Sequence, residues 1–169
     1  MTYARSGDIN KLYPKRKDVE GRWLCRWCGK RLKGRRTSWC CKEHADEVFI
    51  RCWPVTAKWA VWERDGGVCA RCGLDTERLQ ERISRIRRRF GHDIFSQVLL
   101  KYAKRGFPFT LSRSWWEADH IIPVSEGGGN CGLEGYQTLC LPCHKKETAS
   151  LRKRLAKQRL AQQRKPHSA

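Results

Sequence analysis

The chain has 169 residues, and its 36 lysines and arginines outnumber its 17 aspartates and glutamates to give a formal charge of +19. This length suits one moderate domain, or a small domain with an appended module, and excludes a single large core. The charge favours polyanions, because lysine and arginine side chains release counterions when they contact phosphates, so nucleic acid is the first partner to consider.

The sequence argues against membrane and secreted proteins. No apolar run reaches the roughly 18 residues of a membrane span, and the N-terminal residues are polar and basic, unlike a secretory signal. The chain also has 10 cysteines, which stay reduced and free to bind metal in the cytosol. We therefore expect a cytoplasmic zinc protein that is not secreted and has no membrane partner.

Residues 1–21 are expected to form a flexible basic arm, because they alternate charged residues with glycine and proline and offer no periodic apolar face. Residues 22–53 follow as a small zinc-finger module, in which a Cys-x-x-Cys turn precedes a second ligand pair. A spacing of four would place Cys40 and His44 on one face of a helix, which favours Cys40, and Cys41 stays an alternative. The expected ligands are Cys25, Cys28, Cys40 and His44.

Residues 54–155 are expected to form the main domain, with a helical insertion at residues 74–114. A short helix is predicted over Thr56 to Arg64. From Thr76 to Lys104 apolar residues recur at helical intervals and Gly91 interrupts them, which predicts two helices. The first of these helices is rich in arginine, and this pattern fits a phosphate-binding face and a solvated face equally well.

Two strands and a long helix are predicted next. Trp115 to Val124 is rich in aromatic and β-branched residues and leads into Gly127-Gly128-Gly129, which is typical of a strand entering a wide hairpin. The second strand is predicted over Tyr136 to Leu139. After Cys143, helix formers continue without glycine or proline until Pro166, which predicts a long C-terminal helix. These elements together indicate the α+β class.

The C-terminal helix is strongly basic, and its end and tail are residues 156–169. Between Arg152 and Lys165 it carries seven basic residues and no acidic one. A frayed, solvated tail is the alternative, but the lack of acidic residues removes the usual pairing within a helix and favours contact with DNA. The residues expected to contact DNA are Arg152, Lys153, Arg154 and Lys157.

Two similar Cys-x-x-Cys turns enclose the insertion and the strands. Each presents two thiolates, and together they complete a tetrahedral structural Zn²⁺ site. A redox pair or two disulfides is the less favoured alternative. Because metal binding contributes folding free energy, the site is expected to tie the chain together on both sides of the insertion. The expected ligands are Cys69, Cys72, Cys140 and Cys143, which leaves Cys52 and Cys131 as small buried residues.

Asp119 and His120 form a candidate active site within this tether. A nuclease needs a divalent ion to hold the scissile phosphate and a general base to activate water. Asp119 offers a hard oxygen ligand, and its neighbour on a strand projects to the opposite side unless the backbone twists, so the pair can divide these two tasks. His144 directly follows a zinc ligand and is the candidate second ligand of the catalytic ion. An Asp-His pair on its own is more often structural.

The combination of motifs resembles the HNH (His-Asn-His) endonuclease family, which has a ββα-metal fold. The resemblance covers roughly Thr56 to Leu155. It rests on Asp119-His120-Ile121-Ile122-Pro123, Gly127-Gly128-Gly129 and Gln137-Thr138-Leu139-Cys140-Leu141-Pro142-Cys143-His144. The N-terminal finger is similar to those of bacterial and phage-type members, so the resemblance implies a bacterial or phage-encoded protein.

The resemblance implies a role for each matching residue. His120 corresponds to the general base, Asp119 and His144 to ligands of the catalytic ion, and the cysteine quartet to a structural zinc site. One departure is Gly135, which stands where the family commonly has its middle Asn. The candidate replacement ligands are Asn130 and Glu134. The expected metals are two structural Zn²⁺ ions and one catalytic Mg²⁺, Mn²⁺, Ni²⁺ or Zn²⁺ ion, with no small-molecule cofactor.

Three functions are distinguished. The first is a metal-dependent DNA endonuclease that nicks one strand at a time and leaves, by resemblance, a 5′ phosphate and a 3′ hydroxyl. The alternative is an inactive zinc-dependent DNA-binding module that keeps the fold but has lost its chemistry at Gly135. A basic protein-interaction module is suggested by the eight tryptophans. We favour the first because a decayed enzyme has little reason to keep Asp119, His120 and His144 together; the oligomeric state carries no prediction.

Overall fold

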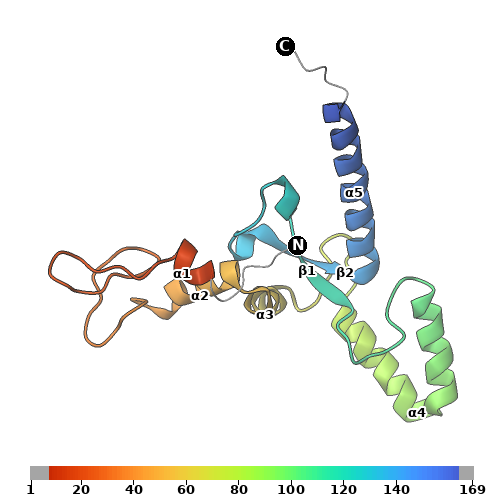
Figure 1. Ribbon diagram of the computed structural model, residues 1–169. Helices are drawn as coiled ribbons and strands as arrows, with labels where there is room; N and C mark the ends of the chain where they lie inside the picture. The colour runs from red at the N-terminus through yellow and green to blue at the C-terminus, as the bar shows by residue number, and fades with distance from the viewer. Residues whose placement is uncertain (1–7, 164–169) are drawn as a thin grey trace. The chain divides into compact units, whose positions relative to one another are not determined.

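A computed structural model describes residues 8–163 of the chain (Figure 1). Its helices and strands are, in chain order, α1 (Asp8–Leu12), α2 (Lys42–Cys52), α3 (Pro54–Asp65), α4 (Thr76–Ala103), β1 (Trp116–His120), β2 (Tyr136–Cys140) and α5 (Leu141–Gln163). Two short 3₁₀ turns, η1 (Val124–Glu126) and η2 (Leu133–Gly135), lie between the strands. The fold is therefore α+β, as the sequence predicts. The start of the expected arm and the end of the expected tail lie outside the described residues.

The chain separates into two compact units that interleave along the sequence. Unit one consists of Met1–Arg64 and His120–Gln137, and unit two consists of Asp65–Asp119 and Thr138–Ala169. The break after Arg64 differs from the expected boundary after residue 53. The hairpin loop between the strands groups with the N-terminal finger, which no local pattern in the sequence indicates.

Within the described part of the chain, residues 8–21 pack against the finger, whereas a loose arm is expected over residues 1–21. Ile9 of α1 is buried in a small core with Val48 and Cys52 of α2. The Arg26 guanidinium donates to the carbonyl oxygen of Ile9 at 2.9 Å, which holds α1 against the finger. Lys17 pairs with Trp23 in an isolated antiparallel bridge. Residues 8–21 thus belong to the folded finger, because they supply part of its apolar core.

The helix α3 begins at Pro54, whose fixed φ suits the first turn of a helix. It starts two residues before the predicted Thr56 and ends one residue after Arg64. Its buried residues are Ala57 and Val61, whereas the indole rings of Trp59 and Trp62 contact each other at the surface. The aromatic side chains of this helix therefore do not form its core.

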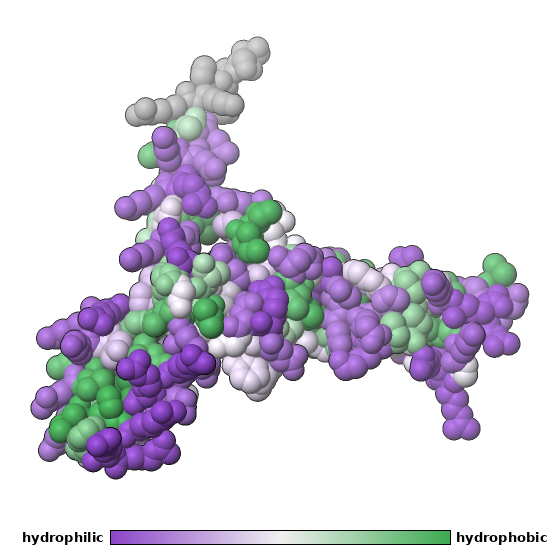
Figure 2. Space-filling view, turned by 180° about the vertical axis from the view of Figure 1, so that it is seen from behind, coloured by the Kyte–Doolittle hydropathy of each residue, from purple (hydrophilic) through white to green (hydrophobic). Residues whose placement is uncertain are grey.

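In unit two, α4 has the predicted interruption at Gly91, where φ is 79° and ψ is −174°. Asp75 caps the helix by accepting the N–H of Arg78 at 2.9 Å. The inner faces of the two halves bury Ile83, Phe95 and Leu99 in the core of the unit. The outer face carries exposed arginines, and Figure 2 shows apolar side chains of α4 beside strongly hydrophilic ones.

The two strands form one two-stranded sheet. The N–H of Ile121 donates to the carbonyl of Gly135 at 2.9 Å, and the N–H of Leu141 donates to that of Trp115 at 3.0 Å. Residue numbers therefore rise along one strand as they fall along the other, so the pairing is antiparallel. β1 ends at His120, earlier than the predicted Val124, because the chain turns into η1 at Pro123, which has no N–H for a ladder.

The helix α5 begins within the second Cys-x-x-Cys turn, and Cys143 is its buried residue. Beyond its first turns, most of its side chains are exposed. Figure 2 shows that this part of the helix carries mainly hydrophilic side chains. None of the helices in the described residues is both long and apolar enough to cross a membrane.

Candidate active site and metal centres

The cysteine quartet of unit two has the geometry of a tetrahedral metal site. The ligand atoms of Cys69, Cys72, Cys140 and Cys143 all lie within 4.8 Å of one another. The Sγ atoms of Cys72 and Cys140 are 3.7 Å apart. Four sulfurs that are each about 2.3 Å from a zinc ion at a tetrahedron's centre lie about 3.8 Å apart. The donor set therefore fits Zn²⁺.

The electrostatics of this quartet also favour a cation. Burial and neighbouring thiols raise the pKa values of Cys140 and Cys143. Although burial opposes its ionisation, backbone N–H groups of Cys140, Cys72 and Arg71 lower the pKa of Cys69 to about 7. Four thiolates cannot share this space without a positive charge between them, and a divalent ion would supply that charge.

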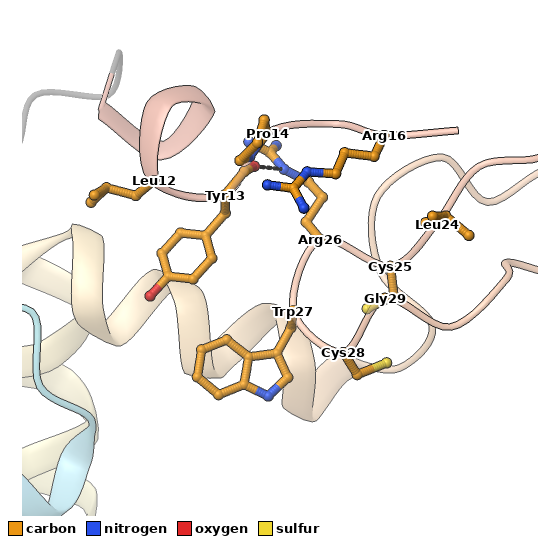
Figure 3. Close-up of a pocket in the computed structure, with 10 residues that line it drawn as sticks. All are labelled: Leu12, Tyr13, Pro14, Arg16, Leu24, Cys25, Arg26, Trp27, Cys28 and Gly29. Carbon is orange, nitrogen blue, oxygen red and sulfur yellow. Dashed lines mark hydrogen bonds between the residues drawn. The ribbon is translucent and has the colours of Figure 1, made fainter. Parts of the chain in front are cut away.

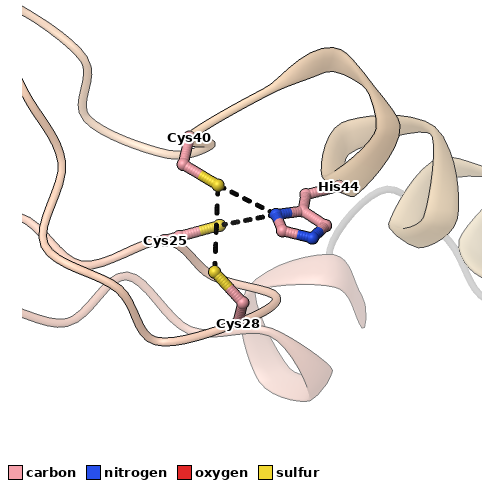
Figure 4. A group of neighbouring side chains, drawn as sticks. All are labelled: Cys25, Cys28, Cys40 and His44. Carbon is pink, nitrogen blue, oxygen red and sulfur yellow. Dashed lines mark hydrogen bonds between the residues drawn. The ribbon is translucent and has the colours of Figure 1, made fainter.

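The finger quartet of unit one is shown in Figure 4. Its ligand atoms, from Cys25, Cys28, Cys40 and His44, also lie within 4.8 Å of one another. The Sγ of Cys25 is 3.8 Å from Nδ1 of His44, and the Sγ of Cys28 is 3.8 Å from that of Cys40. Cys41 stays outside the quartet, with its Sγ 3.9 Å from that of Cys40. The structure thus brings together the four residues expected from the sequence.

The predicted helix face shared by Cys40 and His44 is wrong. Cys40 does not share a helix face with His44, because α2 begins at Lys42, after both cysteines. Cys40 instead lies in the turn before the helix, and only His44 projects from α2. The extended backbone at Cys41 directs the chain from the turn into the helix.

A pocket of 320 Å³ lies beside this quartet, lined in part by Tyr13, Arg16 and Trp27 (Figure 3). Its aromatic rings, those of Tyr13 and Trp27, are 5.9 Å apart at their centroids. Arg26, which also lines it, donates to the carbonyls of Ile9 and Tyr13. That guanidinium is therefore committed to holding α1, which makes it part of the scaffold of the finger.

Asp119 and His144 lie close together in unit two. The Oδ1 atom of Asp119 is 3.8 Å from the Nε2 atom of His144, and both side chains are half-buried. Two ligand atoms that are each about 2.1 Å from one ion lie at most about 4.2 Å apart, so this spacing fits a shared divalent ion. A pair of protein ligands would leave further positions for water and phosphate oxygens, as Mg²⁺ commonly requires.

His120 lies directly opposite Tyr136 in the sheet, and the centroids of their rings are 4.4 Å apart. Successive residues of a strand project to opposite faces, so the side chains of Asp119 and His120 leave β1 on different sides. The division of tasks between the two residues stays a prediction.

Gly135 leaves no space for a side chain. A Cβ atom at this position would lie 2.5 Å from both Cβ and Sγ of Cys131. Of the two candidate replacement ligands, Glu134 directs its carboxylate towards Arg51 at 3.9 Å. Asn130 is exposed and has a left-handed backbone with φ of 56°. Cys131 thus occupies the place that an Asn side chain at position 135 would need.

Sequence reasoning missed two adjacent residues at the end of α3. Arg64 donates to the carbonyl oxygens of Leu133 and Tyr136, at 2.8 and 2.9 Å. Asp65 accepts the hydroxyl of the buried Thr138 at 2.7 Å. One sequence signal could have indicated them: an Arg-Asp pair stands directly before a Gly-Gly turn and a Cys-x-x-Cys turn. Such a pair is usually interpreted as the solvated end of a helix.

The residues expected to contact DNA lie on α5. Arg152, Lys153, Arg154 and Lys157 are all exposed. Arg154 also approaches the hydroxyl of Ser150 at 3.4 Å. The helix therefore presents these cationic groups to solvent, where a polyanion can reach them.

Comparison with known proteins gives one family and three relatives. Residues 106–150 match the family model of the HNH endonucleases. The chain is 29% identical over 154 residues to the DNA annealing helicase and endonuclease ZRANB3 of Mus musculus, and to those of Bos taurus and Homo sapiens. Each alignment covers 83% of this chain but only 14% of the relative. No solved structure matches the chain at comparable significance.

These similarities bear on the expected type of protein. The relatives are mammalian, so they give no support to the expected bacterial or phage type. The matched segment contains Asp119, His120 and His144 together with the second cysteine pair. Residues 106–150 are thus similar to HNH endonucleases over the whole of the candidate active site.

Proposed function

We propose that this chain is a metal-dependent DNA endonuclease that hydrolyses one phosphodiester bond at a time and so nicks duplex DNA. The observation that carries this proposal is the 3.8 Å approach of Asp119 to His144, with His120 as the next residue along β1. The similarity of residues 106–150 to HNH endonucleases supports it. The relatives are named as a DNA annealing helicase and endonuclease.

Each of the three residues has a distinct role in the proposed reaction. Asp119 and His144 would hold a divalent ion, Mg²⁺, Mn²⁺, Ni²⁺ or Zn²⁺, which when bound neutralises the phosphate and stabilises the leaving oxygen. His120 accepts the proton of the attacking water as general base. The products are a 5′ phosphate and a 3′ hydroxyl.

The two zinc quartets would act as scaffold. His144 directly follows Cys143 at the start of α5, so an ion bound by the quartet would hold the backbone that carries the His144 imidazole. The exposed basic residues of α5 would contact the DNA backbone, which positions the enzyme without selecting a sequence.

The proposal is tested with supercoiled plasmid, incubated with the full chain in chelator and then in each of the four metals. We expect metal-dependent nicking that His120→Ala abolishes, while zinc content and circular dichroism stay unchanged. The matched control is His92→Ala, because His92 is an exposed histidine of α4. Nicking that survives His120→Ala would show that His120 is not the base.

The second candidate is a DNA-binding module without catalytic activity. It is favoured by Gly135, whose side-chain space is filled by Cys131. It predicts salt-sensitive DNA binding with no cleavage in any metal. Plasmid that stays supercoiled throughout, with binding intact in a gel shift, would establish this candidate in place of the first.

A further inference from the structure

We propose that Arg64 is a positioning residue for His120, acting through the turn that carries Gly135. This inference rests on the proposed function, in which His120 is the base. Arg64, the turn η2, Tyr136 and His120 all belong to unit one.

The turn η2 is approached from α2, where Nη2 of Arg51 lies 3.9 Å from the Glu134 carboxylate. It runs from Leu133 to Gly135 and is preceded by Gly132. The N–H of Gly135 donates to the carbonyl of Gly132 at 3.0 Å, which closes the 3₁₀ turn. The carbonyls of Leu133 and Tyr136, on either side of Gly135, are bound from α3.

Arg64 makes these two bonds with both arms of its guanidinium. Nη1 donates to the carbonyl of Leu133 at 2.8 Å, and Nη2 donates to that of Tyr136 at 2.9 Å. These two carbonyls bracket Gly135. The planar fork of arginine fixes the direction of both bonds at once, which a single ammonium group cannot do.

The register of the sheet explains why Tyr136 needs this donor. Ile121 and Gly135 form a hydrogen-bonded pair of the antiparallel sheet. Hydrogen-bonded and non-hydrogen-bonded pairs alternate along such a sheet, so the adjacent pair, His120 and Tyr136, shares no backbone hydrogen bond. The carbonyl of Tyr136 therefore points away from β1, to the outer edge of β2. Arg64 satisfies it there.

The same turn contacts His120 and its neighbour. The ring of Tyr136 is buried and lies 4.4 Å from the imidazole, measured between centroids. The carbonyl of Gly135 accepts the N–H of Ile121 at 2.9 Å. A displacement of the turn would therefore move both the ring that packs on His120 and the backbone that follows it.

The far half of β2 is held independently of Arg64. The carbonyl of Thr138 accepts the N–H of Ala70 at 2.8 Å, and its hydroxyl donates to Asp65 at 2.7 Å. Loss of the Arg64 bonds should thus release Tyr136 and the turn before it without detaching the strand. This makes Asp65→Ala a matched control, because it weakens the strand next to Arg64 but leaves both Arg64 bonds in place.

The test uses the zinc-loaded full chain with ¹³C- and ¹⁵N-labelled histidine, and the His120 signal is assigned by its loss in His120→Ala. We expect Arg64→Met to shift the His120 imidazole resonances and to change the pH profile of nicking. It should lower kcat by about 10- to 100-fold, as a displacement of about 1 Å can do. The KM for DNA should stay unchanged. Arg64→Lys should give an intermediate shift, because a point charge replaces only one of two bonds.

The controls separate positioning from stability and from activity. Asp65→Ala should lower the melting temperature but leave the His120 resonances in place. If Arg64→Met loses zinc or unfolds, the shift of the His120 resonances in Arg64→Lys decides whether Arg64 positions His120. Unmoved His120 resonances in the folded Arg64 variants would overturn the proposal. If the wild type nicks DNA in no metal, the proposed function fails, yet the resonances still report whether Arg64 positions His120.

Discussion

Gly135 and Cys131 show how one residue can set the space available to another. The sequence identifies Gly135 only as a departure from a motif, whereas the structure gives it a steric cause, since Cβ and Sγ of Cys131 lie 2.5 Å from where a Cβ would stand. A missing Asn at this position is therefore coupled to Cys131. Changing one of the two without the other should be costly.

We expect Gly135→Asn alone to destabilise the protein by about 1–3 kcal/mol, the usual cost of overpacking. The double variant Gly135→Asn with Cys131→Gly should recover most of this loss, because both close contacts disappear; Cys131→Ala would keep its Cβ in the way. Chemical unfolding measures the difference. The control is Gly129→Asn, where the nearest neighbouring atom lies 3.4 Å from the added Cβ. Equal destabilisation by the single and double variants would contradict the steric explanation.

Asp119 gives a second prediction at this scale. Asp119→Ala should reduce nicking by at least about 100-fold, because it removes the carboxylate that would hold the catalytic ion. The zinc content should stay at two ions per chain, since Asp119 is in neither quartet. Atomic absorption and plasmid nicking measure the two effects. Asp93→Ala, at an exposed site on α4, is the control. Full activity of Asp119→Ala would remove this residue from the site.

Among the helices, α4 and α5 show that the local sequence can predict where a helix is interrupted and where it starts. The interruption of α4 at Gly91 follows from the backbone itself, because its φ of 79° and ψ of −174° belong to a region that is almost restricted to glycine. The start of α5 at the second Cys-x-x-Cys turn follows the last strand directly. What the helices pack against depends instead on contacts from distant segments.

The kink of α4 can be tested by Gly91→Ala. Alanine should cost about 1–3 kcal/mol of stability, because it must adopt this backbone conformation or straighten the helix and separate Phe95 from Ile83. Thermal and chemical unfolding measure the loss. Gln97→Ala, at an exposed helical position, should be neutral or mildly stabilising. A stabilised Gly91→Ala would mean that the helix runs straight.

The DNA-contacting role of α5 can be tested by replacing Arg152, Lys153, Arg154 and Lys157 together with alanine. DNA affinity should fall, and the slope of log affinity against log salt should decrease by up to about 3.6, or about 0.9 for each lost phosphate contact. Alanine keeps the helix, so circular dichroism should not change. The control replaces Gln158 and Gln162, which carry no charge. An unchanged salt slope would place the DNA on another surface.

For the molecule as a whole, we expect metal binding and folding to be coupled in each of the two units. Each unit contains one quartet, and each quartet joins segments that are distant in the sequence or lack a large core of their own. The chain covers only 14% of the length of its relatives, so any activity of such a larger protein is a separate question.

Removal of zinc should therefore unfold both units. A strong chelator is expected to release two zinc ions per chain and to abolish the cooperative unfolding transition, because the quartets contribute folding free energy. Acid should have the same effect, since the ligand thiols and imidazole bind metal only when deprotonated, so zinc affinity falls as pH falls. Calorimetry with a metal-sensitive dye measures both. A protein that unfolds cooperatively at the same temperature after losing both ions would contradict this coupling.

The sequence by itself determined the features that depend on residue chemistry and short spacing. Both Cys/His clusters that could hold a metal ion, the interruption at Gly91 and the α+β class could be predicted, because Cys-x-x-Cys spacing and backbone restriction are properties of a few neighbouring residues. The tertiary structure decided the rest. It placed Cys40 before its helix, packed Ile9 into the finger, and brought Arg64 to the carbonyls of Leu133 and Tyr136. The two Arg64 hydrogen bonds join residues about seventy positions apart. No local pattern in the sequence shows which distant segments will come into contact.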